Sequence, residues 1–514
     1  MTSRRLILLA PALLLLTLIA WAFSSPVGSS PDEDYHLVSI WCETEDPAAC
    51  EMSADEDSAT VPEALLEVAC FAFDSDTSAA CQRGIDFTGA PDSETERGNF
   101  YGGYPPLFHS VLSLFVGDHI EVSVLTMRVA ISIIFTALAS ALFYLLPPHR
   151  RPTLVWSWAV TMVPIGLFIV ASVNPSTWAI AGVGFGWLAL AGFFESQGWR
   201  KVGLAALFAL SVIMATGSRG DASMYMALAI VATIVLTVRR SRRYLLESIL
   251  PLAAVIYCAF AFRVSRPPEA ITQGLPSGGG GGGEDSPVVS VFSRVIPTLF
   301  DIPGLWMGVF GRGWGLGWVD TAMPALVWVA ALSCFLGAGL TAGTRADVRK
   351  ALVLGGGVIV LLAFPTAVLV AAGEAVGENL QPRYLLPLIV LFAGVLFWVP
   401  EGKSITFSRP QRLIVIGSLA MAHAVALFLQ LSRYVTGFDD LGVDLDGSIE
   451  WWWSGFASPL TVWVLGSLSF AVLLVLTLGR DHAVELERRE RAFEQREDVV
   501  EQLADALDLQ EVRR

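Results

Sequence analysis

Three consecutive carboxylates and a histidine form the densest set of reactive side chains in the sequence. Asp32, Glu33 and Asp34 are followed by His36 in the segment SPDEDYHL at 30–37. Like charges this close raise one another's pKa, and a carboxylate with a raised pKa can act as a general base near neutral pH. Asp32 and Glu33 could also hold a divalent cation through oxygen ligands. The alternative is a solvated helix cap, because Pro-Asp-Glu commonly begins a helix.

A sparse set of arginines forms a second candidate group. Arg219 in GSRGD and Arg312 in FGRGWG lie in loops that we assign below to the extracytoplasmic side, Arg383 in QPRYLLP begins a predicted span at that side, and Arg128 lies inside the second predicted span. A guanidinium can bind a phosphate through two parallel hydrogen bonds, so these arginines are candidates for binding a donor phosphate. The alternative is ordinary snorkelling or pairing with the acidic loop.

Other polar residues could complete a substrate site. Tyr104 and His109 lie in YGGYPPLFHSV at 101–111, where paired prolines would fix a turn. Asn174 in SVNPSTW and Asp221 lie at the same predicted level. The sequence contains no Walker-type glycine loop, HExxH motif or GxSxG elbow, which argues against an ATP-driven pump.

The composition shows where these residues must be positioned. The 514 residues are 54% hydrophobic and only 16% charged, with a mean hydropathy of +0.59, whereas soluble domains have about 25% charged residues. Apolar stretches recur at the length of about 20 residues that a helix needs to cross a bilayer. The predicted fold is therefore an all-α polytopic membrane protein with about 12 transmembrane helices and a large extracytoplasmic first loop.

Twelve spans satisfy the hydropathy pattern. They cover residues 6–23, 122–146, 152–172, 177–195, 201–217, 222–238, 245–262, 321–342, 351–372, 383–400, 412–431 and 459–479. With this arrangement the basic clusters fall on one side, which the positive-inside rule makes cytoplasmic. The first span could be a signal peptide, but it lacks a small-x-small cleavage site, and we interpret it as a retained helix.

These spans divide the chain into six segments. A first helix (1–24) precedes an acidic extracytoplasmic loop (25–121). Helices two to seven (122–262) and eight to twelve (321–479) are separated by a glycine-rich and aromatic loop (263–320), which could lie in the interface or re-enter the membrane. The remaining segment, 480–514, has helical periodicity and mixed charge, and predicts a cytoplasmic amphipathic helix through which the chain could oligomerise.

The first loop carries four of the six cysteines, Cys42, Cys50, Cys70 and Cys81. An even set confined to one loop indicates two disulfides and a non-cytoplasmic location. Three pairings are open, and four free thiols are the alternative. The same loop holds much of the acidic excess behind the net charge of −15, which argues against nucleic acid as a partner.

The segments SPDEDYH, YPPLFHS, SVNPS, SRGD and QPRYLLPL together resemble the predicted-membrane-protein family called domain of unknown function 2142, over roughly residues 5–400. The family's Pro-Asp-Glu-x-x-His element matches Pro31, Asp32, Glu33 and His36. The family is in turn similar to the C-type (GT-C) glycosyltransferase superfamily. That likeness implies a polyprenyl-phosphate sugar as donor and a carboxylate of the first outer loop, with Asp32 the first choice, as base.

The sequence thus predicts an inverting glycosyltransferase of the plasma (inner) membrane, with its active site on the extracytoplasmic side. Its partners would be a lipid-linked sugar donor and a cell-envelope glycan or glycolipid acceptor, with a divalent cation as an optional cofactor. One alternative is a transporter or flippase of lipid-linked glycans, although the helix interiors are almost free of acidic residues. Another is a scaffold that binds partners through its acidic loop.

Overall fold

The computed structural model describes residues 7–44, 46, 49–265, 287–344, 346–378, 380–400 and 405–479. For residues 7 and 287–293 it describes the backbone alone. The predicted tail at 480–514 and the run of glycines at 278–283 lie outside these ranges.

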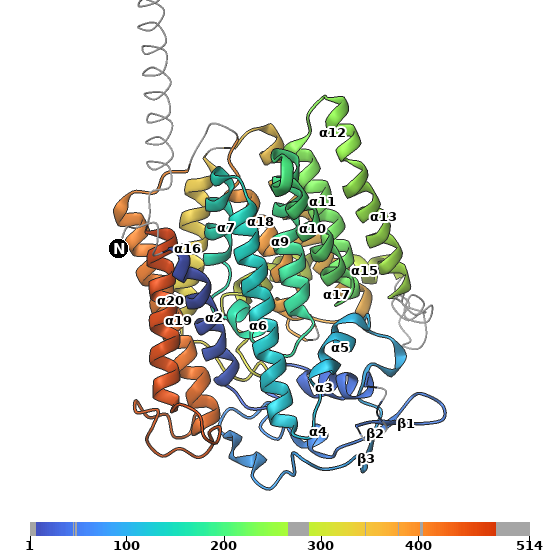
Figure 1. Ribbon diagram of the computed structural model, residues 1–514, viewed down its shortest axis with the longest axis vertical. Coiled ribbons are helices and arrows are strands. Elements are labelled where there is room, and N and C mark those ends of the chain that lie inside the picture. Colours follow the sequence, from blue (N-terminus) through green and yellow to red (C-terminus); the bar gives the residue numbers. More distant parts are fainter. Residues whose placement is uncertain are drawn as a thin grey trace, which may run out of the picture.

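The described part of the chain is mostly helical, and nine of its helices are long and apolar enough to cross a membrane. They run side by side to form a bundle (Figure 1). These spans are Ile120–Leu145 (α6), Ser176–Glu195 (α9), Gly198–Thr216 (α10), Gly220–Thr237 (α11), Arg242–Val264 (α12, Arg242–Glu247, with α13, Ile249–Val264), Ala325–Gly343 (α16), Val348–Ala372 (α17), Arg409–Val435 (α19) and Pro459–Leu478 (α20).

The other three predicted spans overlap shorter helices in the sequence. Two of them correspond to the apolar helices Ala10–Phe23 (α2) and Leu386–Leu396 (α18). The single helix predicted over 152–172 is wrong, because the chain forms Arg151–Ala159 (α7) and Ile165–Val170 (α8) there. Pro164 directly precedes α8, and a proline disfavours helical geometry in the residue before it. The total of 12 crossings therefore stays a prediction.

The predicted first loop forms a small folded layer at one end of the bundle, drawn in blue in Figure 1. It contains the helices Glu33–Cys42 (α3), Ala64–Glu67 (α4) and Leu107–Leu112 (α5). The strands Glu51–Met52 (β1), Ala59–Val61 (β2) and Ser93–Thr95 (β3) pair antiparallel in the order β1-β2-β3, with Glu51 opposite Thr60 and Ala59 opposite Thr95.

Two local disulfides hold this layer together. Cys42 is bonded to Cys50, and Cys70 is bonded to Cys81. The prediction of two disulfides is confirmed, and the pairing that the sequence left open links neighbours along the chain. We call this end of the bundle the disulfide end.

The predicted loop 263–320 also contains a helix, Pro287–Gly308 (α15). It packs along α17, where the Trp306 indole donates a hydrogen bond to the carbonyl of Leu361 at 3.2 Å. The chain after α15 returns to the disulfide end, where the Trp318 indole donates to the carbonyl of Gly28 at 2.7 Å. A segment predicted as a loop therefore becomes a wall of the bundle and a support for the segment after α2.

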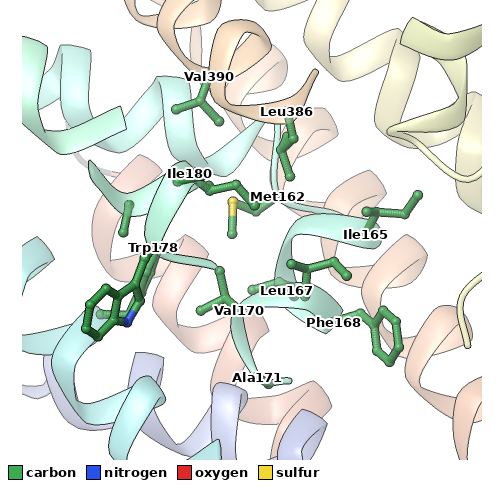
Figure 2. Close-up of a cluster of buried hydrophobic side chains, with 14 of the residues drawn as sticks. Met162, Ile165, Leu167, Phe168, Val170, Ala171, Trp178, Ile180, Leu386 and Val390 are labelled. Carbon is green, nitrogen blue, oxygen red and sulfur yellow. The ribbon is translucent and has the colours of Figure 1, made fainter. Parts of the chain in front are cut away.

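The centre of the bundle is built around α9, whose residues are almost all buried. Small residues allow this close packing: a Cβ at Gly182 would lie 2.7 Å from the Ser211 carbonyl oxygen of α10. Figure 2 shows the buried cluster beside it, where Ile165 and Leu167 of α8 lie near Leu386 of α18. This apolar packing places the start of α18 next to the disulfide end.

Candidate functional site

The segment between α2 and α3 is fixed by hydrogen bonds to its backbone. From Ser25 to Pro31, each of seven consecutive carbonyl groups accepts a hydrogen bond. Glu33 donates one of these bonds from its own backbone, to Ser30. The others come from side chains scattered over the sequence: Arg128 to Ser25 and Pro26, Gln82 to Val27, Trp318 to Gly28, Tyr434 to Ser29, and Asn174 with Arg383 to Pro31. The residue that follows, Asp32, is therefore held by a rigid backbone.

Glu33 points inward from the first turn of α3 and pairs with Arg128 of α6. Both side chains are buried, at 0% and 2% exposure. Both carboxylate oxygens of Glu33 accept from Arg128 Nη2 at 3.0 Å, and the backbone N–H of Ser30 also donates to one of them. Arg128 further donates to the carbonyl of Ala22. We call Arg128, Glu33 and the carbonyls they fix the buried anchor; the structure places both residues there rather than at an accessible phosphate site.

Asp32 has the opposite environment, although it directly precedes Glu33 in the chain. Its backbone is left-handed, with φ of 61°, which is unusual for a residue other than glycine. Its side chain is 35% exposed, and its Oδ2 lies 2.5 Å from Nη2 of the buried Arg383. Arg383 also donates to the carbonyl of Pro31 through Nη1 at 3.0 Å. An accessible carboxylate is thus held in direct contact with a buried cation.

A second arginine lies beside this pair. The Arg219 guanidinium is 4.1 Å from the ring centre of Tyr384, whose hydroxyl accepts a hydrogen bond from Arg383 Nη2 at 3.0 Å. Arg219 is held by Asp221, through two hydrogen bonds of 2.9 Å, and by Ser176. Burial opposes its charge, but the Asp221 carboxylate holds the pKa of Arg219 well above its usual value. We call Asp32, Arg383, Arg219 and Tyr384 the Asp32 pocket.

Asn174 links the Asp32 pocket to the rigid segment. Its amide Nδ2 donates to the carbonyl of Pro31 at 3.0 Å, and its Oδ1 accepts from the backbone N–H of Ser176. It is 1% exposed. Asn174 therefore positions the backbone before Asp32.

Two buried histidines lie on the other side of Asp32. His36 Nδ1 and His109 Nε2 share a hydrogen bond of 3.2 Å, and the Tyr104 ring packs edge-on against His36. Burial, the other histidine and then the Arg383 charge lower the pKa of His36 well below its usual value. Burial also lowers the pKa of His109 to about 4. The pair is therefore neutral at physiological pH and provides uncharged packing beside the arginines.

Asp34 lies on the outer surface of α3 and pairs with Arg97. The two are joined by contacts of 2.5 Å and 3.0 Å, and the Arg97 side chain is 51% exposed. Arg97 Nη2 also lies 3.8 Å from Asp32 Oδ1. Three arginines thus face three aspartates around Asp32, so the formal charges balance: Arg97 with Asp34, Arg219 with Asp221, and Arg383 with Asp32.

Most of the sequence of the chain also matches a known family. The family described as "Predicted membrane protein (DUF2142)" matches residues 15–392. The chain belongs to this family. No curated protein and no solved structure matches the chain.

The family match covers every residue of the Asp32 pocket and of the buried anchor. Two members of the site were missed from the sequence. Tyr384 adjoins Arg383 in the PRY segment, and Arg97 is one of only two basic residues between 25 and 104. An isolated base in an acidic loop was a signal for Arg97, but nothing in the sequence indicated that Tyr384 would link two guanidinium groups.

Two predicted features are not part of this arrangement. They are Arg312 and a divalent-cation site at Asp32 and Glu33. Arg312 is exposed, and its guanidinium contacts Met307 and Trp328 instead. A cation held by Asp32 and Glu33 does not fit, because Glu33 is enclosed with Arg128. Within the described ranges, no three His, Cys, Asp or Glu side chains gather closely enough to hold a metal ion.

Proposed function

We propose that this multi-pass membrane protein is an inverting glycosyltransferase of the GT-C type. It would transfer a sugar from a polyprenyl-phosphate donor to a cell-envelope glycan or glycolipid on the extracytoplasmic face of the plasma membrane. The observation that supports this most is the contact between the accessible Asp32 carboxylate and the buried Arg383. The two disulfides beside them favour an oxidising, extracytoplasmic location.

Asp32 is the base in this proposal. Its carboxylate takes the proton of the acceptor hydroxyl while the oxygen of that hydroxyl attacks the anomeric carbon of the sugar. The bond from that carbon to the phosphate oxygen breaks on the opposite face, so the configuration inverts. Because the segment from Ser25 to Pro31 is fixed, little reorganisation is needed to place Asp32.

Arg383 and Arg219 stabilise the leaving phosphate. The donor phosphodiester carries one negative charge and leaves as a phosphate monoester with a second, while Asp32 loses its charge on taking the proton. The total negative charge is therefore the same before and after transfer. Arg219, whose side chain is the more accessible of the two, is the cation that the phosphate can reach, and Arg383 adds its charge from behind Asp32 and the Tyr384 ring.

The other residues that were predicted to bind substrate have supporting roles in this proposal. Tyr104 closes the side of the pocket next to His36, and burial raises the pKa of its hydroxyl, which therefore stays protonated and able to donate to a sugar oxygen. Asp221 and Asn174 hold Arg219 and the Pro31 backbone, respectively. We assign them to positioning rather than to chemistry.

The test is transfer of labelled sugar from a panel of polyprenyl-phosphate sugars to an envelope-glycan extract, with protein in lipid nanodiscs. We expect Asp32→Asn to lower the rate by about 10²–10⁴-fold, the usual contribution of a positioned base. Asp118→Asn, at an exposed position, is the matched control and should keep the full rate. Full activity of Asp32→Asn would refute the assignment of the base, and no transfer by the wild type from any donor would contradict the function.

A further inference from the structure

An apolar cleft of about 280 Å³ lies between α11, α17 and α18 and opens to the outside of the bundle, where Val231 and Leu352 at its edge are exposed. All of its lining side chains are apolar, and its walls include Val231 and Val235 of α11, Gly356 of α17, and Leu391 and Val395 of α18. These walls contain no buried polar side chain that would need a hydrogen bond from water. The chemistry of the cleft is therefore that of a hydrocarbon site.

Glycines on α17 create the opening. Gly356 and Gly357 line the cleft, and a Cβ added at Gly356 would meet no atom within 4 Å. The neighbouring Gly355 also faces open space but does not line the cleft. A Cβ at Gly356 therefore enters free space, so a larger side chain there can occupy part of the cleft, and a matched substitution is available one residue away.

Two of the three helices that form the cleft begin directly after the arginines of the Asp32 pocket. Arg219 is the residue before α11, and Arg383 lies three residues before α18. The cleft residues of α11, Leu228 to Val235, lie about 14–24 Å along the helix from Arg219, at about 1.5 Å per residue. One leaflet of the hydrocarbon core is about 15 Å thick. The cleft residues of α18, Leu388 to Val395, lie about 8–18 Å from Arg383 by the same rise, so the cleft begins about 8–14 Å from the two arginines and extends beyond the depth of one leaflet.

A further contact lies between the Asp32 pocket and the cleft. Tyr225 of α11 packs edge-on against Phe364 of α17, with ring centres 5.4 Å apart. Its hydroxyl is buried, and among the described residues it has no hydrogen-bond partner. A buried donor without a partner is available to a polar group of a ligand or to a water.

We propose that the cleft binds the distal part of the apolar chain of a long-chain lipid phosphate, and that it makes the protein selective for chain length. This inference rests on the proposed function, because it takes the lipid phosphate to lie at Arg219 and Arg383. A chain anchored there must extend about 8–14 Å to reach the cleft and about 18–24 Å to fill it. A short chain would leave the cleft empty while its phosphate still bound.

The gain for a long chain comes from packing. Lipid tails are as apolar as the cleft walls, so moving a chain from the bilayer into the cleft removes no apolar surface from water. Close contact with the walls still adds many small dispersion terms. We therefore expect a preference on the order of tenfold for the long chain.

The test measures binding of prenyl phosphates that carry no sugar, so that it does not depend on transfer. Decaprenyl phosphate and geranyl phosphate would compete with a photoreactive prenyl-phosphate probe for protein in nanodiscs. The variants are Gly356→Leu, which occupies part of the cleft, and Gly355→Leu as the control. Both replace a helical glycine by leucine, so both gain helix propensity equally.

We expect the wild type and Gly355→Leu to bind the long chain about tenfold more tightly than the short one. Gly356→Leu should bind both chains with the short-chain affinity. Equal binding of both chains by the wild type, or an unchanged preference in Gly356→Leu, would overturn the inference. Selective binding without sugar transfer in the assay described above would instead leave the inference standing and remove the proposed function.

Discussion

The buried anchor and the Asp32 pocket contain neighbouring residues with the same chemistry in opposite environments. Glu33 and Asp32 each pair with one buried arginine, but Glu33 is fully enclosed whereas Asp32 is 35% exposed. In the buried anchor the arginine bonds extensively to protein carbonyls, and the pair serves structure. In the Asp32 pocket the carboxylate remains accessible to a substrate. Exposure, not residue type, separates the structural pair from the candidate chemical one.

The largest expected difference between the buried anchor and the Asp32 pocket should appear when each carboxylate is neutralised in turn. Glu33→Gln leaves Arg128 as a buried charge without a counter-ion, which should lower the free energy of unfolding by about 3–5 kcal/mol. Asp32→Asn also leaves a buried arginine, Arg383, without its ion-pair partner. The Asp32 side is open to water, however, and Arg383 still donates to the Pro31 carbonyl and the Tyr384 hydroxyl, so we expect a smaller loss of about 1–2 kcal/mol. Thermal unfolding in detergent, followed by tryptophan fluorescence, would measure both. Equal losses in the two variants would show that the two regions do not differ in this way.

A second prediction concerns acid. Burial lowers the pKa of His109 to about 4, whereas the unfolded chain titrates near 6.5. Between these values the unfolded state binds more protons, so the free energy of unfolding rises with pH and levels off above about 6.5. Acidification to pH 4 should therefore cost up to about 3 kcal/mol from this residue, and His36 adds to it in the same direction.

His109→Gln should remove much of this acid sensitivity. His119→Gln is the control, because His119 is exposed and should leave the pH dependence unchanged. The measurement is the unfolding temperature between about pH 4 and 7. If His109→Gln remains as acid-sensitive as the wild type, the histidine pair is not the source.

A third prediction tests the bonds that fix the segment before Asp32. Trp318→Phe keeps an aromatic ring but leaves the buried carbonyl of Gly28 without its donor. We expect a loss of about 1–2 kcal/mol in the free energy of unfolding. Trp199→Phe, at a side chain that is 60% exposed, should change little. An unaltered unfolding temperature in Trp318→Phe would mean that this carbonyl finds another partner.

The smallest effect is expected at the surface of α3. Arg97→Gln breaks the pair with Asp34, but the Arg97 side chain is half exposed, so we expect a change of at most about 1 kcal/mol. High salt should weaken the wild-type pair to the same extent. A loss comparable with that of Glu33→Gln would place Arg97 among the structural arginines.

The sequence predicted the elements better than the directions of side chains. Each of the 12 predicted spans overlaps at least one helix, and two disulfides form as predicted. The break at Pro164 and the helix α15 were missed, because hydropathy reports apolar content and not where a helix ends. Spacing alone could not show that Glu33 turns inward and Asp32 outward, since that depends on the left-handed backbone at Asp32.

The bonds to the carbonyls from Ser25 to Pro31 also set an order of assembly. This segment is translated before all of the side chains that donate to it, which come from Gln82, Arg128, Asn174, Trp318, Arg383 and Tyr434. The last donor belongs to α19, beyond the part of the chain that the family match covers. Asp32 thus reaches its final position only after the chain has been made at least as far as Tyr434. A nascent chain that ends between Tyr384 and Tyr434 would carry every residue of the Asp32 pocket without the full set of bonds that fixes it.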